Sequence, residues 1–267
     1  MASFSVVTNV ASINAQANLN NTTRGVQKSL NRLSSGFRIN QAGDDVAGLA
    51  VANAYRSDIA IVNQGIRNAN DGLSNLQIKD GALNNISNLL DRLATLSTQA
   101  ASGSTIDASR VTLNTGFADI LTEITREATV ATLSTSQGFS VFVSNNGSNG
   151  KVTGTVSATT TSTLTLAGHI LTSQALAESA VAVVASAVTV LGTRQGTVGT
   201  LQNRLQFAIS LAQNQVVSNS AAESRIRDAS IAEESANLTW FNILSQSGIS
   251  ALAQANQSTS SVLALLR

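Results

Sequence analysis

The stretch "SLNRLSSGFRINQAGDDVAGLAVANAY", residues 29–55, places a short connector between two segments with helical periodicity. Glycines within the connector allow the chain to turn. Two adjacent carboxylates precede the second helix, where they can accept backbone N–H groups and face the positive end of the helix dipole. The neighbouring residues supply no cleft or further metal ligands. We therefore interpret this stretch as a connector with a helix cap, formed by Gly36, Arg38, Gly43, Asp44 and Asp45.

The segment after the connector predicts one long helix from residue 45 to about residue 101. Its apolar residues recur at alternating steps of three and four, the pattern of a coiled coil. Such a helix is about 80 Å long at 1.5 Å per residue. Three glycines inside it, Gly65, Gly72 and Gly81, each cost about 1 kcal/mol relative to alanine, so we expect packing neighbours to offset them. The apolar stripe is Ile59, Val62, Ile66, Ala69, Leu73, Leu76, Leu83, Ile86, Leu90 and Leu93.

The rest of the chain predicts further helices on either side of a small β region. Residues 106–132 have helical periodicity, and so do residues from about 181 to about 217. Between them, "GFSVFVSNNGSNGKVTGTV" alternates apolar and polar residues around two Asn-Gly pairs, which predicts a β-hairpin. A short strand is expected near residues 164–166. Residues 4–34 form a weakly apolar helix with a stripe at Val10, Ile13, Ala17, Val26, Leu30 and Leu33.

The last 40 residues predict a final helix with a seam of small residues, and the order of elements is then nearly palindromic. The simplest way to bury all the stripes is to fold the chain back at the β region, so that the two halves run antiparallel and the termini meet. The fold class is therefore mainly α: an elongated antiparallel helical bundle or coiled coil with a small β-hairpin region at mid-chain. The C-terminal seam is Leu238, Phe241, Ser245, Gly248, Leu252, Ala255, Thr259, Val262 and Leu266.

The residue composition excludes most kinds of catalytic and metal-binding site. The 267 residues include no cysteine, no proline and a single histidine, His169, which stands apart from any cysteine or carboxylate cluster. We therefore expect no enzyme activity, no cofactor and no metal.

The net charge of +1 gives no global attraction for nucleic acid, and the basic stripe Arg24, Lys28 and Arg32 lacks interleaved aromatic residues. Neither a secretory signal peptide nor a run of about 20 apolar residues is visible, so we expect no membrane insertion.

The two ends differ in charge. Residues 1–42 carry four basic residues and no acidic residue, whereas residues 228–267 carry three acidic residues against Arg267. This complementarity fits a pairing of the two terminal helices.

Three long segments resemble bacterial flagellin. They read "NRLSSGFRINQAGDDVAGLAVANAYRSDI", "NANDGLSNLQIKDGALNNISNLLDRLATLS" and "ALAQANQSTSSVLALLR". The resemblance covers roughly residues 1–130 and 175–267. Only about 40 residues, 136–174, separate these two arms, which implies a short form without large outer domains. The chain departs from the family in lacking the usual proline near the C-terminus.

The resemblance implies a structural subunit that polymerises into the extracellular flagellar filament for motility. It implies an inner-core domain (1–42 with 228–267), a helical rod domain (43–135 with 172–227) and a β-hairpin region of that rod (136–171). It also implies export without a cleaved signal peptide, and terminal helices that become ordered on assembly. The residues expected to pack between subunits in the inner core are Ile13, Leu30, Leu33, Leu238, Phe241, Leu252, Val262 and Leu266.

The partners that the resemblance implies are further copies of the chain, a flagellar export chaperone, the export apparatus, and filament cap and junction proteins. An animal Toll-like receptor is a further partner, through Leu90, Arg92 and Leu96, although Thr95 replaces the acidic residue typical of the recognised segment. Three alternatives stay open at this stage: a hook–filament junction protein, a secreted effector or adhesin, and an enzyme on a helical scaffold.

Overall fold

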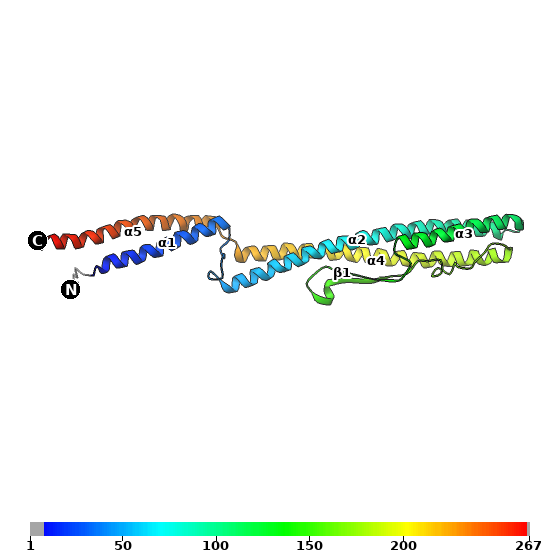
Figure 1. Ribbon diagram of the computed structural model, residues 1–267, viewed down its shortest axis with the longest axis horizontal. Helices are drawn as coiled ribbons and strands as arrows, with labels where there is room; N and C mark the ends of the chain where they lie inside the picture. Colours follow the sequence, from blue (N-terminus) through cyan, green and yellow to red (C-terminus); the bar gives the residue numbers. More distant parts are fainter. Residues whose placement is uncertain (1–7, 266–267) are drawn as a thin grey trace. The chain divides into compact units, whose positions relative to one another are not determined.

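The computed structural model describes residues 8–265 of the chain, with side chains for residues 8–257. Within this range there are five α-helices and one two-stranded antiparallel sheet (Figure 1). The mainly α fold class with a hairpin at mid-chain is therefore confirmed. The elements are α1 (Val10–Ser35), α2 (Val46–Ala101), α3 (Asp107–Val130), β1 (Gln137–Phe142), the 3-10 helix η1 (Gly147–Gly150), β2 (Lys151–Val156), α4 (Gln174–Arg227) and α5 (Ile231–Leu265).

The chain forms two compact units. The terminal unit comprises Met1–Ser57 with Ser218–Arg267, and the central unit comprises Asp58–Val217. The boundaries predicted from the sequence, at residues 42/43 and 227/228, concern roles in an assembly and stay a prediction. The helix that was expected to end near residue 217 continues to Arg227, because nothing in residues 218–227 breaks a helix and "SNSAAESRIR" contains neither glycine nor proline.

In the terminal unit, α1 and α5 pack side by side and antiparallel (Figure 1). The Asn9 side chain donates to the Ala255 carbonyl at 2.9 Å, near the start of α1 and the far end of α5. At the other end of the pair, Arg32 contacts Glu234. The α5 side of this seam follows the predicted small-residue pattern. Its buried and half-buried residues include Glu234, Leu238, Phe241, Ser245, Gly248, Leu252 and Ala255.

Only part of the stripe predicted for α1 lies in the seam: Val26 and Leu33 are half-buried. Val10, Ile13 and Leu30 are 62%, 56% and 54% exposed. Small residues form much of the rest of the seam, because they let the two helix backbones approach closely. At Gly25, the Phe241 ring occupies the space that a side chain would need. The residues of α1 that are buried or half-buried include Ser12, Ala15, Leu19, Thr22, Gly25, Val26, Ser29 and Leu33.

The central unit has one hydrophobic core, to which α2, α3, α4 and the sheet all contribute. Leu205 of α4 lies beside Gly72 of α2, and Gln195 of α4 donates to Asn84 of α2 at 3.0 Å, so these two helices run antiparallel. Most of the stripe predicted for α2 lies in this core. Its fully buried members are Leu76, Leu83, Ile86, Leu90 and Leu93, with Ala69, and they meet Phe117 and Ile124 of α3 and Val184, Leu191, Val198 and Leu205 of α4.

The hairpin is confirmed, and its strands pair from Gln137↔Val156 to Phe142↔Lys151. The Asn-Gly pairs lie in a longer connection that contains η1, so neither forms a two-residue turn. The strand expected near residues 164–166 is wrong. Leu164 and Leu166 are buried, but they belong to a turn in which the Leu166 N–H donates to the Thr161 carbonyl. Apolar and polar residues alternate here because the side chains alternate in burial along an irregular segment.

One helix among the described residues, α4, is long and apolar enough by composition to cross a membrane, with a window of mean hydropathy 1.8. Nine of its residues are nevertheless buried within the fold, including Val184, Leu191 and Leu205. Of that window, 28% is buried, so the core of the central unit takes up part of its apolar surface.

The C-terminal end of α3 carries a strained threonine. Thr132 has φ +55°, a left-handed conformation that β-branched residues rarely adopt. Its N–H donates to the Thr129 carbonyl and the Leu133 N–H donates to the Ala128 carbonyl, which is the Schellman arrangement that usually places glycine at this position. We expect Thr132→Gly to stabilise the central unit by about 1 kcal/mol. Thermal unfolding measures this, and Thr135→Gly, at a position without positive φ, should destabilise the unit instead.

Candidate functional site

Two connectors lie together in the terminal unit: residues 36–45 between α1 and α2, and residues 228–230 between α4 and α5. Phe37 and Asp228 form an antiparallel bridge. In it, the Arg38 N–H donates to the Arg227 carbonyl at 2.6 Å, and the Ala229 N–H donates to the Gly36 carbonyl at 2.9 Å. Gly36 has φ +75°, so a side chain there would be strained. The two connectors therefore hold each other in place through backbone hydrogen bonds.

Side chains reinforce this bridge. The Arg227 guanidinium lies over the Phe37 ring, 4.1 Å from its centre, and the Arg38 side chain donates to the Ile226 carbonyl at 2.7 Å. Ile39 is 1% exposed and anchors the connector in the terminal unit. In contrast, Gly43 has no positive φ and open space where a side chain would lie, so this position does not require glycine.

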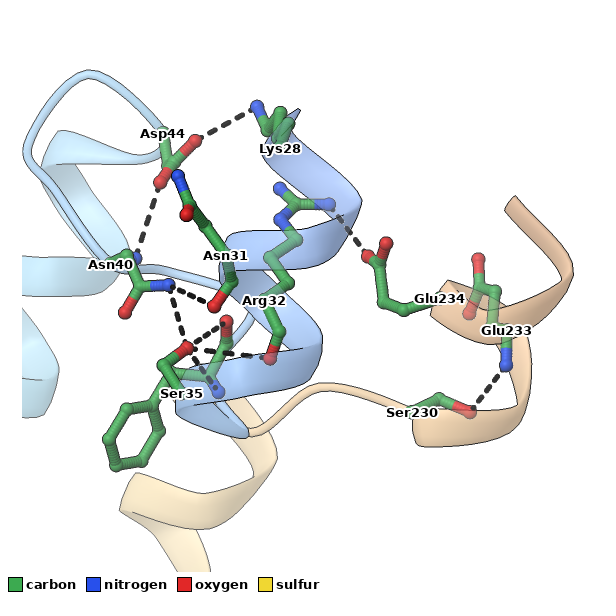
Figure 2. Close-up of polar contacts among 10 residues, drawn as sticks. Lys28, Asn31, Arg32, Ser35, Asn40, Asp44, Ser230, Glu233 and Glu234 are labelled. Atoms are coloured by element: carbon green, nitrogen blue, oxygen red, sulfur yellow. Dashed lines mark hydrogen bonds and ion pairs between the residues drawn. The ribbon is translucent and has the colours of Figure 1, made fainter. Parts of the chain in front are cut away.

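A buried ion pair joins α1 to α5. Arg32 donates to Glu234 at 2.8 Å, and the two side chains are 21% and 8% exposed (Figure 2). Arg32 lies in the last turn of α1 and Glu234 in the first turn of α5, so each charge also meets the favourable end of its own helix dipole. This pair realises the charge complementarity of the two chain ends, and it specifies one register between the helices.

The two adjacent aspartates have different roles. Asp45 caps α2, because its Oδ1 accepts the Gly48 N–H at 2.9 Å. Asp44 instead closes the connector: its carboxylate accepts the backbone N–H groups of Asn40 and Gln41 and pairs with Lys28 of α1 at 2.9 Å (Figure 2). Among the described residues neither Arg32 nor Arg38 pairs with these aspartates. Lys28 pairs with Asp44, and Arg32 pairs with Glu234.

The connector should respond to acid through Asp44. The hydrogen bond from Lys28 holds the pKa of this carboxyl below its ordinary value of 3.8, the Asn40 and Gln41 N–H groups act in the same direction, and burial opposes them. A lowered pKa means that the contact stabilises the fold at pH values above 3.8 and is lost as the pH falls through the lowered pKa. We expect the Asn40 amide proton signal to shift over that acidic range, and we expect Asp44→Asn to remove the shift. NMR titration of both proteins measures it.

A polar pocket of about 570 Å³ adjoins these pairs, lined by α1 residues and by the 36–45 connector. Of its charged groups, Lys28 pairs with Asp44, Arg32 pairs with Glu234 of α5, and Arg24 has no ion pair among the described residues. Among residues 8–265, no group of three or more histidine, cysteine or acidic side chains could hold a metal ion. In this region opposite charges pair, as in Lys28 with Asp44 and Arg32 with Glu234, and these pairs hold the helices and the connector in position.

The outer faces of α1 and α5 expose large apolar side chains. Besides Val10, Ile13 and Leu30 on α1, the exposed residues on α5 are Ile231, Trp240, Ile243 and Ile249, at 54% to 63%. The Trp240 ring lies 5.0 Å from the Phe241 ring, which links the exposed face to the seam. A shallow groove along α5 is lined by Ile243 together with Thr239, Asn242, Gln246, Ser247 and Ser250. Large contiguous exposed apolar patches mark interaction sites in many proteins.

The predicted packing residues fall into two groups. Ile13 and Leu30 belong to the exposed face, whereas Leu33, Leu238, Phe241 and Leu252 are half-buried in the α1–α5 seam. The side chain of Val262 and the whole of Leu266 lie outside the described residues. For all of them, contact with another subunit stays a prediction.

The residues expected to contact an innate receptor lie on α2 of the central unit. Leu90 and Leu96 are 0% and 7% exposed, so both belong to the core. Arg92 and Thr95 are exposed. In this fold only Arg92, of the three predicted residues, is free to touch another protein directly.

Sequence reasoning missed Phe37, Arg227 and Glu234, which complete the connector. Glu234 was noted only as part of the negative charge of the C-terminal end. The one signal that pointed to it was the charge asymmetry between the chain ends, which predicts that acids of α5 meet bases of α1 but does not say which residues pair.

Family models match both arms of the chain. The bacterial flagellin N-terminal helical region matches residues 6–141, and the bacterial flagellin C-terminal helical region matches residues 181–266. The chain is 33% identical to the flagellin of Halalkalibacterium halodurans over 272 residues, which cover 97% of this chain and 98% of that protein. It is also 33% identical to the flagellar filament 33 kDa core protein of Treponema phagedenis, over 97% of this chain and 98% of that one.

A third relative is a longer protein, and only part of it is similar to this chain. The B-type flagellin of Pseudomonas aeruginosa is 44% identical over 123 residues, which are 46% of this chain and 25% of that protein. The relatives of similar length match from end to end, whereas this longer one matches over part of its length.

Proposed function

Because the chain belongs to the bacterial flagellin family, we infer that it works by self-assembly: it is a structural subunit of the flagellar filament. It is a short form without a large outer domain. As a filament component it acts outside the cell. The comparisons do not favour the hook–filament junction protein.

The single observation that best supports self-assembly is the uncovered apolar face of α1 and α5. Burial of apolar surface contributes about 25 cal/mol per Å² removed from water. The seam between these helices mixes small and polar residues with a few larger apolar ones such as Leu238 and Phe241, so it supplies only part of this contribution. Further copies of the chain would cover this face. We propose that Ile13 and Leu30, with Ile243 and Trp240, pack against neighbouring subunits. We propose the same for Val262 and Leu266 at the C-terminal end.

Folding and assembly are coupled, because apolar burial must offset the conformational entropy lost when the terminal helices become ordered. Ordering a residue costs about 1 to 2 kcal/mol of conformational entropy, and the α1–α5 seam alone offsets little of that cost. We propose that the terminal unit gains order when copies surround it, which links its stability to subunit concentration.

Substituting Ile243 tests the apolar face. It is 63% exposed, so Ile243→Asp should leave the monomer's thermal unfolding unchanged. In a polymer the carboxylate would be buried without a partner, and we expect the critical concentration for polymerisation to rise at least tenfold. Sedimentation of seeded protein measures it. Ile106→Asp is the matched control, since Ile106 is 68% exposed at the start of α3, and normal polymerisation of Ile243→Asp would contradict the assignment.

The remaining partners belong to the same proposal. Export through the flagellar apparatus, without a cleaved signal peptide, would require the chain to pass unfolded. This fits terminal helices that depend on assembly for their order. An export chaperone would cover the exposed residues of α5 before export, and cap and junction proteins would meet them afterwards. Because Leu90 and Leu96 are buried, only Arg92 of the three residues expected at an innate receptor would contact it directly.

A further inference from the structure

The central unit holds a lysine in an unusual environment. Lys79 of α2 is 5% exposed, and no ion pair or hydrogen bond of its ammonium occurs among the described residues. The side-chain stem carries most of this burial, because the Nζ itself is not among the buried nitrogen and oxygen atoms that lack a partner and so keeps contact with solvent. Burial lowers the pKa of the Lys79 ammonium, as expected for a cation that is partly removed from water.

Lys79 lines an open pocket of about 350 Å³ between α2 and β1. Asp71, Gly72 and Asn75 of α2, Thr132 after α3, and residues 137–140 of β1 complete its wall. Asp71 is the one other charged residue in this wall, and it is exposed and makes no ion pair with Lys79. Asp80, the next residue along α2, is half-buried, and its carboxylate accepts a weak hydrogen bond from Asn84 at 3.5 Å. The pocket wall therefore carries an ammonium and a carboxylate that are not paired with each other, among polar neighbours.

We propose that this pocket binds a carboxylate from the central unit of a second copy of the chain. The proposal rests on the proposed function, because a filament subunit is surrounded by copies of itself. Charge complementarity supplies the occupant: Asp91, Asp119 and Glu178 are exposed acids of the central unit that have no ion-pair partner among the described residues. A carboxylate in the pocket would pair with the ammonium and offset its desolvation cost. It would also fix the register between copies, since like charges or empty pockets would face each other in other registers.

Carbodiimide cross-linking of the assembled protein tests the contact. This reagent joins a carboxylate to a lysine amine only where the two touch, and the chain has three lysines, at positions 28, 79 and 151. Filaments are grown from an equal mixture of isotopically light and heavy full-length protein. We expect mixed-isotope peptides that join Lys79 to an acid of residues 58–217 in the polymer and not in the monomer. Lys28 with Asp44, 2.9 Å apart within one chain, is the internal control and should give same-isotope peptides in both states.

Three variants accompany the cross-link. Lys79→Met keeps the long side chain and removes the charge, so it should fold normally and raise the critical concentration about tenfold. Lys79→Arg keeps the charge and should polymerise like the parent, but without the cross-link. Lys151→Met, at an exposed lysine of β2, should change nothing.

Several results would overturn the proposal. They are a Lys79→Met variant that polymerises at the parent's critical concentration, a same-isotope link between Lys79 and Asp71, and saturation of the pocket in the monomer by free phosphate with no effect of phosphate on assembly. If the parent protein itself does not polymerise, the proposed function fails first, and the pocket proposal falls with it.

Discussion

Deleting residues 1–35 or residues 230–267 is expected to abolish filaments completely while leaving the central unit folded. Each deletion removes one partner of the α1–α5 pair, and with it half of the exposed apolar face. The hydrophobic core of the central unit lies within residues 62–212, so it loses none of its buried side chains. Electron microscopy and sedimentation measure filament formation, and circular dichroism measures the helix that remains.

The reason for so complete an effect is that neither terminal helix can stand alone. Helices of 26 and 35 residues with small, polar seams obtain most of their stability from packing against a partner. The lone helix left by either deletion would expose both its seam and its outer face. A truncated protein that polymerised at the parent's critical concentration would refute the assignment of α1 and α5 to the assembly surface. The control is the thermal unfolding of the central unit, which should be the same in the truncated and full-length proteins.

The helices could be predicted from the sequence because apolar periodicity depends on local order alone. The long helix that begins after Asp45 and the α5 seam at Leu238, Phe241 and Leu252 both followed from steps of three and four. The α1 seam could be predicted only in part in this way. Val26 and Leu33 of the predicted stripe lie in it. Small residues such as Gly25 and Ser29 contribute by allowing close approach, while the more apolar Ile13 and Leu30 stay outside.

The connector shows a second feature that a single sequence predicts only in part. The cap at Asp45 is local, and the residue type and position predict it. The Arg32–Glu234 pair joins residues 202 positions apart, and the Phe37–Asp228 bridge joins two connectors that are almost as far apart in the sequence. A single sequence gives the charges of the two ends but not their register, because register is fixed by the packing of the whole helix pair.

The glycines of α2 show a third feature that the sequence does not predict. Gly65, Gly72 and Gly81 were all expected to be offset by packing, but their surroundings in the structure differ. At Gly65, an added Cβ would lie only 1.8 Å from the position of the Val143 carbonyl oxygen, and at Gly72 it would lie 2.8 Å from Val141. At Gly81 nothing lies within 4 Å. The expectation that packing offsets every glycine therefore holds for the first two and, within the described residues, not for Gly81.

Two alanine substitutions on this one helix should therefore change stability in opposite directions. Gly65→Ala would push the hairpin backbone away from α2, because the obstacle is a main-chain carbonyl that no rotamer change can move, and we expect a loss of about 2 to 4 kcal/mol. Gly81→Ala should gain about 1 kcal/mol from helix propensity alone. At roughly 2 to 4 °C per kcal/mol for a unit of this size, thermal unfolding separates them clearly. Because Gly81 is open in the subunit, a Gly81→Ala protein that is more stable as a monomer yet assembles poorly would mean that a neighbouring copy approaches α2 at this point. Equal effects at the two sites would instead show that the hairpin is not held against α2 at Gly65.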